Sequence, residues 1–97
     1  MRYEIVLAPD AAEDLKALPA NLRSTVKAAM ETHLRNTPTR TSRSRVKRLR
    51  ELDHPQYRLR VDEVRVFYDV IDETVQILAI VRKAEASTWL EQFESKD

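Results

Sequence analysis

Residues 57–69 read YRLRVDEVRVFYD, and their alternation decides the fold expected for this chain. Successive side chains of an extended strand point to opposite sides, so Arg58 and Arg60 share one side and the apolar residues beside them share the other. The half from Val64 to Asp69 alternates in the same way, and Asp62-Glu63 is a candidate turn between the halves. The stretch therefore predicts a β-hairpin with one apolar face and one cationic face.

A turn centred on Asp62-Glu63 places Arg60 directly opposite Arg65. Like charges in such a cross-strand pair destabilise a sheet by roughly 0.2 to 1 kcal/mol. Folding gives no reason to keep this pair, whereas an anionic ligand bound to both guanidinium groups would. The hairpin is therefore a candidate anion-binding surface.

Composition restricts the class of protein. A chain of 97 residues suits a single domain over residues 1–97, and 42% hydrophobic with 34% charged residues predicts a folded, soluble domain rather than disorder. The chain has no cysteine and two histidines, so we expect no metal site and no cofactor. It has no apolar run long enough for a signal peptide or a membrane span, so we expect a cytoplasmic protein without a membrane partner.

The positive charge is concentrated in one third of the chain. Residues 40–65 contain nine Lys or Arg against four acids, a net charge of +5. Because the whole chain carries +1, the remainder carries −4. Such segregation is typical of a phosphate-binding surface, although a solvated basic loop would have the same composition.

Six further elements are expected around the hairpin. Alternation in residues 3–7 predicts a first strand, and Asp10 with Glu13 fits a capping box for a helix that Pro19 stops. Apolar spacing predicts a second helix over residues 20–35. A loop, a short strand over residues 46–52, a third meander strand over residues 75–82 and a helix over residues 84–94 follow. The fold expected is α+β, with an N-terminal strand, a helical hairpin, a mainly antiparallel meander sheet and a short C-terminal helix.

Pairing Val70 with Val75 sets the expected register of the third strand. On this register Arg82, and not Lys83, joins the cationic face of Arg65. The remaining expected neighbours are Tyr68 with Ile77, Val66 with Ala79, Val64 with Val81, and Arg65 near Ile80. A bulge would shift these pairs by one residue, and the chain has no glycine to mark its tight turns.

The cationic face is not expected to be polar throughout. In the expected register this face also carries Phe67, Leu78 and Ile80. It should therefore be exposed to solvent at its cationic end and covered by another part of the chain at its apolar end. The C-terminal helix is the candidate cover, since its apolar residues recur at helical spacing. These are Ala86, Trp89, Leu90 and Phe93.

The order of these elements resembles the RelE/ParE superfamily of bacterial type II toxins, and the resemblance spans nearly the whole chain. Its motifs are APDAAEDL at residues 8–15 with Leu18-Pro19, VKRL at residues 46–49, and YRLRV, VRVFY and Ile71-Asp72 in the meander. The resemblance is closest to the RelE branch and implies a RelE-like microbial RNase fold.

In the RelE branch this resemblance implies a ribosome-dependent endoribonuclease that cuts messenger RNA in the decoding site and inhibits translation. It implies as partners the ribosome, mRNA and a cognate antitoxin, whose acidic, amphipathic segment would hold the toxin inactive in a hetero-oligomer. In ParE-like relatives the target is DNA gyrase instead. A non-catalytic RNA-binding module is the third alternative that the basic residues leave open.

The resemblance also assigns candidate residues by position. Arg58 and Arg60 match basic strand residues of the RelE branch, Arg65 matches its central arginine, and Arg82 or Lys83 lies near a further basic position. Trp89 stands near the branch's C-terminal tyrosine. The candidate catalytic set is Arg58, Arg60, Arg65 and Arg82, and the candidate RNA-binding set is Arg45, Lys47, Arg48, Arg50 and Trp89.

Arginines suit metal-independent cleavage of RNA, in which a ribose 2′-OH attacks the adjacent phosphate. Their planar groups bind phosphate oxygens through two bonds and stay charged, but they are poor proton shuttles. His54 and Glu51 are the nearby candidates for proton transfer, although a plain loop role also explains His54. Trp89 can stack on a base but has no phenolic proton, and its spacing also fits a helix stripe that faces the core.

Overall fold

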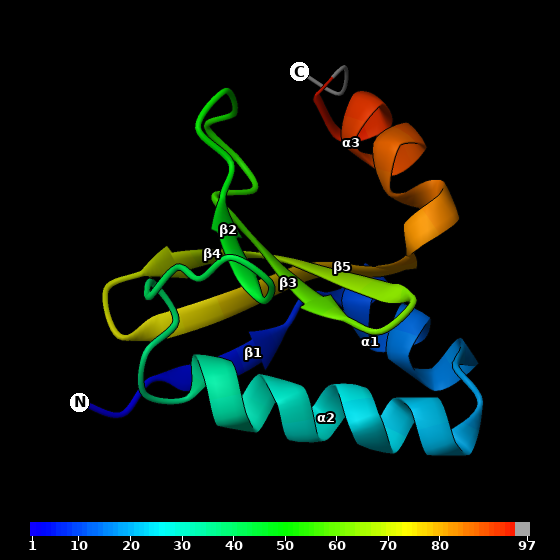
Figure 1. The fold of residues 1–97 in the computed structure, drawn as a ribbon, viewed down its shortest axis with the longest axis horizontal. Coiled ribbons are helices and arrows are strands. Elements are labelled where there is room, and N and C mark those ends of the chain that lie inside the picture. The colour runs from blue at the N-terminus through cyan, green and yellow to red at the C-terminus, as the bar shows by residue number, and fades with distance from the viewer. Residues whose placement is uncertain (95–97) are drawn as a thin grey trace.

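The computed structural model describes residues 1–94, which contain a five-stranded mixed sheet with helices on both of its faces (Figure 1). The strand order is β1-β5-β4-β3-β2, with β1 parallel to β5 and the other pairs antiparallel. The α+β fold expected from the sequence is confirmed, and only residues 95–97 lie outside the described part. The elements are β1 Glu4–Leu7, α1 Pro9–Ala17, α2 Ala20–Leu34, β2 Val46–Arg48, β3 Tyr57–Val61, β4 Val64–Ile71, β5 Thr74–Arg82, a 3-10 turn η1 Lys83–Glu85 and α3 Ala86–Glu94.

The start of α1 differs from the expected capping box. Pro9 is the first helical residue, and Ala8 is the N-cap without a side-chain bond. Proline at this position needs no hydrogen-bond partner and has a helical φ already, so the helix begins two residues earlier than a capping box at Asp10 would place it. Asp10 therefore lies in the first helical turn and cannot cap it.

The core lies between one face of the sheet and the α1–α2 hairpin (Figure 1). Leu59, Val66 and Ile77 of the sheet are fully buried there, as are Val26 and Leu34 of α2. Burying side chains of this size stabilises a fold by about 1.5 to 3 kcal/mol each. The apolar half of the hairpin alternation thus faces the helices, which leaves its cationic half on the opposite face.

The β3–β4 hairpin has the expected register, with Arg60 directly opposite Arg65. Its turn is made without glycine, because Asp62 takes a positive φ of 51°. Asp72 has a φ of 55° in the next turn. Aspartate enters this left-handed region more readily than most residues, which explains tight turns in a chain that lacks glycine.

The pairing of β4 with β5 contains a bulge between Phe67 and Tyr68. The expected pairs of Val70 with Val75 and Tyr68 with Ile77 are confirmed, but the pairs beyond them are wrong by one residue. An extra residue, Leu78, enters β5, and the backbone N–H of Ile80 donates to Asp14 Oδ2 at 3.0 Å. The observed partners are Phe67 with Ala79, Val66 with Ile80, Arg65 with Val81 and Val64 with Arg82.

This shift moves two side chains to the other face of the sheet. Ile80 is buried in the core at 3% exposure, so it does not line the cationic face. Arg82 pairs with the core residue Val64, so its predicted place beside Arg65 is wrong.

The helices of residues 1–94 are too short or too polar to cross a bilayer.

Candidate nucleic-acid interface

Four cations from neighbouring strands share the sheet face opposite the helical hairpin. Lys47 of β2 pairs with Arg58 of β3, and Arg60 of β3 pairs with Arg65 of β4. We call Lys47, Arg58, Arg60 and Arg65 the cationic face. Within residues 1–94, no carboxylate oxygen lies within 4.0 Å of any of their charged nitrogens. Their positive charge is therefore not neutralised by direct ion pairs with the acids of that part of the chain.

Arg65 is held in place by the hairpin turn. It is buried to 7% exposure, and its Nη1 donates to the carbonyl oxygens of Asp62 at 2.8 Å and Val64 at 3.0 Å. Burial first, and then the neighbouring Arg60, lower the pKa of Arg65. Because a guanidinium loses its proton only at very high pH, Arg65 stays charged and forms a fixed positive group.

Arg58 is only partly buried, but its Nε is fully enclosed and has no hydrogen-bond partner among residues 1–94. Burial, followed by the charges of Arg65 and Arg60, lowers the pKa of Arg58. A buried donor left without a partner costs about 1 to 3 kcal/mol. The repulsion among the three guanidinium groups favours an anion at this site, although the enclosed Nε itself is not accessible to one.

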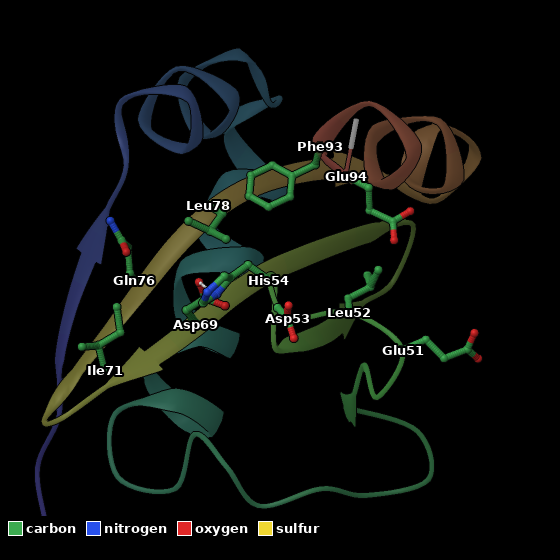
Figure 2. A pocket seen from close by; sticks show the side chains of 10 residues that line it. All are labelled: Glu51, Leu52, Asp53, His54, Asp69, Ile71, Gln76, Leu78, Phe93 and Glu94. Carbon is green, nitrogen blue, oxygen red and sulfur yellow. Dashed lines mark hydrogen bonds and ion pairs between the residues drawn. The ribbon is translucent and has the colours of Figure 1, made fainter. Parts of the chain in front are cut away.

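Two hollows meet each other, and one of them reaches the cationic face at Lys47. One, of about 680 Å³, is lined by Lys47 and Arg50 on one side and by Leu90 of α3 on the other. The second, of about 700 Å³, is lined by His54 and Asp69 and, from α3, by Phe93 (Figure 2). The two share three lining residues, Glu51, Leu52 and Glu94. An extended ligand on the first hollow can thus continue into the second.

The second hollow contains a histidine held by a buried carboxylate. His54 Nδ1 lies 2.8 Å from Asp69 Oδ2, and Asp69 Oδ1 accepts the backbone N–H of Gln56 at 2.7 Å. Asp69 is 4% exposed, whereas the His54 side chain is 58% exposed. The sequence indicates His54 as a candidate for proton transfer but assigns it no partner. Strand alternation places Asp69 on the side of β4 that carries Arg65 and Phe67, but it does not show that the loop after β2 brings His54 to it.

Comparison with known proteins now identifies the class. The family model described as "ParE toxin of type II toxin-antitoxin system, parDE" matches residues 5–86. The chain belongs to the RelE/ParE superfamily of type II toxins. A search of curated protein sequences finds no match to this toxin.

Solved structures of RelE-type proteins are similar in fold to this toxin. A chain of the toxin-antitoxin complex RelBE2 from Mycobacterium tuberculosis has a TM-score of 0.72 at 25% identity, over 84% of the toxin and 99% of that chain. A double arginine-to-alanine mutant of E. coli toxin RelE in the free state has a TM-score of 0.69 at 18% identity, over 100% of both chains. A chain of the RelB-RelE antitoxin-toxin complex from Methanococcus jannaschii has a TM-score of 0.67 at 20% identity, over 87% of the toxin and 96% of that chain.

The other candidate cations of the toxin are not members of the cationic face and have contacts of their own. Arg48 lies with its guanidinium 5.2 Å from the centre of the Tyr57 ring, and its Nη1 donates to the Gln56 carbonyl at 2.8 Å. Arg45 is exposed, and its Nη1 donates to the Arg60 carbonyl at 3.4 Å. Arg50 is exposed in the loop after β2 and lines the first hollow. Arg82 is exposed at the end of β5.

Helix α3 covers part of the face, as expected. Trp89 stacks on Phe67, with ring centres 4.9 Å apart, and on Phe93, with ring centres 4.8 Å apart. Phe67 is only 1% exposed. Because Trp89 already contacts two aromatic rings, it can stack on a base only if α3 or one of these rings moves.

Proposed function

We propose that this toxin is an endoribonuclease that cleaves messenger RNA on the ribosome and thereby inhibits translation in the cytoplasm. The observation that carries the proposal is the Arg60–Arg65 pair, two like charges placed directly opposite each other beside Arg58. An RNA phosphate bound between these groups would turn a repulsive arrangement into an attractive one. Similarity to solved RelE-type structures supports the same choice.

The chemistry requires little beyond position and charge. The ribose 2′-oxygen attacks the adjacent phosphorus, the bond from phosphorus to the 5′-oxygen breaks, and a 2′,3′-cyclic phosphate and a 5′-hydroxyl form. Negative charge grows on the phosphate oxygens during this step, and arginines that are already in place stabilise it without reorganisation. Arg58, Arg60 and Arg65 are the proposed catalytic arginines, with Lys47 and Arg50 binding the RNA backbone. The remaining candidates would contact the RNA only at the edge of the site; these are Arg45, Arg48, Arg82 and Trp89.

Primer extension on transcripts after induced expression tests this proposal. We expect discrete cuts inside translated codons with the wild type, and loss of both cuts and growth arrest with Arg65→Ala. Lys27→Ala, which removes a charge from the exposed side of α2, is the matched control and should cut normally. A folded Arg65→Ala protein that arrests growth as strongly as the wild type would refute the proposal.

A gyrase poison is the second candidate, and the ParE description of the matching family model favours it. It predicts induction of the DNA-damage response while transcripts stay intact. A non-catalytic RNA-binding module predicts RNA retention without cuts. The same induced culture therefore separates all three functions.

We further propose that a cognate antitoxin binds this toxin in a hetero-oligomer. Two of the similar structures are toxin-antitoxin complexes. An acidic, amphipathic segment would pair its carboxylates with the cationic face and reach Phe67 and Leu78 by displacing α3, because Trp89 covers Phe67. A complex that leaves both the cationic face and α3 untouched would contradict this proposal.

A further inference from the structure

The three arginines of the cationic face are poor proton-transfer groups, because a guanidinium keeps its proton at any physiological pH. Histidine is the side chain whose charge ordinarily changes between pH 5 and 8. His54 is therefore of interest for the cleavage step if its ring is oriented and its free nitrogen is accessible.

The orientation of His54 is fixed by Asp69. Asp69 accepts the Gln56 backbone N–H on Oδ1, so its Oδ2 is available to accept a proton from Nδ1 of His54. A carboxylate in this position holds the ring in the tautomer whose proton is on Nδ1. Nε2 then carries a lone pair and has no hydrogen-bond partner among residues 1–94.

The location connects this ring to the proposed RNA site. Asp69 lies two residues beyond Phe67 on β4, and Phe67 pairs with Arg58 of the cationic face. The hollow around His54 adjoins the one that Lys47 and Arg50 line. Two strand residues span roughly 7 Å, about the length of one nucleotide of backbone. RNA held by the arginines can therefore reach the ring.

The surroundings of the ring are acidic as well as apolar. Glu51 and Asp53 of the loop after β2 and Glu94 of α3 line the same hollow, and Figure 2 shows the carboxylate of Asp69 beside the ring and that of Glu51 pointing away from it. Gln76 and Leu78 of β5 complete this side of the hollow. These carboxylates disfavour a phosphate beside His54 itself, so the phosphate would lie on the arginines while the ribose extends toward the ring.

We propose that His54 is the general base of the toxin and that Asp69 is its positioning residue; this inference rests on the proposed function. Nε2 takes the proton of the 2′-hydroxyl as the 2′-oxygen forms its bond to phosphorus. The bond to the 5′-oxygen breaks, and that oxygen takes a proton from water. The resulting imidazolium, stabilised by Asp69, returns its proton to solvent, so the ring is regenerated.

Single-turnover cleavage of mRNA on ribosomes, measured from pH 5.5 to 8.5, tests the proposal. We expect His54→Ala to cleave about 100-fold more slowly than the wild type, because a general base contributes roughly 10²- to 10⁴-fold. The variant should bind ribosomes normally, lose the rise of rate with pH, and regain part of its rate with added imidazole. We expect Asp69→Asn to slow cleavage as well, by up to about the 100-fold loss of His54→Ala, because an amide stabilises the imidazolium less and can hold the ring in the wrong tautomer.

The outcomes separate this proposal from the proposed function. A His54→Ala protein that cleaves at the wild-type rate, while Arg65→Ala does not cleave, would overturn the role of His54 and leave the nuclease intact. Wild-type toxin that makes no cut would overturn both. If His54→Ala unfolds, the pH profile of His54→Gln decides the question, and a wild-type profile would overturn the proposal.

Discussion

At the scale of single residues, the cationic face follows from alternation alone. Arg58, Arg60 and Arg65 share a side because each lies two residues from the next or directly across the turn. The sequence was sufficient to predict this, since a two-residue turn fixes every cross-strand neighbour. The partner of His54 was not predicted, because the bond to Asp69 depends on the path of the loop over residues 49–56.

Tyr68 provides a test of the core at the same scale. Burial, and then the nearby Tyr57, raises the pKa of the Tyr68 phenol, whose hydroxyl donates to the Pro38 carbonyl at 2.6 Å. We expect Tyr68→Phe to lose about 1 to 2 kcal/mol of unfolding free energy, because the buried Pro38 carbonyl loses its donor. Urea unfolding at pH 7 measures this, and an unchanged midpoint would contradict it.

The raised pKa of Tyr68 also predicts a pH dependence. The neutral phenol is favoured in the folded state, so its contribution is complete below the unfolded value near 10 and decreases as pH rises above it. We expect the stability of the wild type to fall more steeply than that of Tyr68→Phe above about pH 10. Equal slopes for the two proteins in alkaline urea titrations would refute the burial of the hydroxyl.

At the scale of elements, helices and strands were predicted to within a few residues, but the β4–β5 bulge was not. No glycine marks it, and the acceptor for the Ile80 N–H is Asp14, which lies on α1 and 66 positions earlier in the chain. A contact between distant segments leaves no local pattern. For this reason Ile80 and Arg82 were placed on the wrong face.

The bulge predicts an effect of substitutions at Asp14. We expect Asp14→Ala to destabilise the fold by about 1 to 3 kcal/mol, because the partly buried Ile80 N–H loses a charged acceptor. Asp14→Asn keeps an acceptor oxygen and should lose less. Chemical unfolding of the two variants measures the difference, and equal losses would argue against the bond.

At the scale of the whole molecule, the separation of charge along the chain becomes a separation of faces. The helical hairpin covers one face of the sheet (Figure 1), and Lys47, Arg58, Arg60 and Arg65 lie on the other. The fold and this polarity could be predicted from periodicity and charge. The second hollow could not, because the loop over residues 49–54, β4, β5 and the end of α3 build it together.

The proposed nuclease keeps the Arg60–Arg65 pair for an RNA phosphate and not for folding. Arg60→Gln tests it most directly, because Arg60 is exposed and its side chain has no hydrogen-bond partner among residues 1–94. The measurement compares the unfolding free energy and the rate of mRNA cleavage of this variant with those of the wild type. The unfolding free energy should stay level or rise by up to about 1 kcal/mol, while the cleavage rate should fall at least about tenfold. A variant that is less stable yet cleaves at the wild-type rate would contradict the claim.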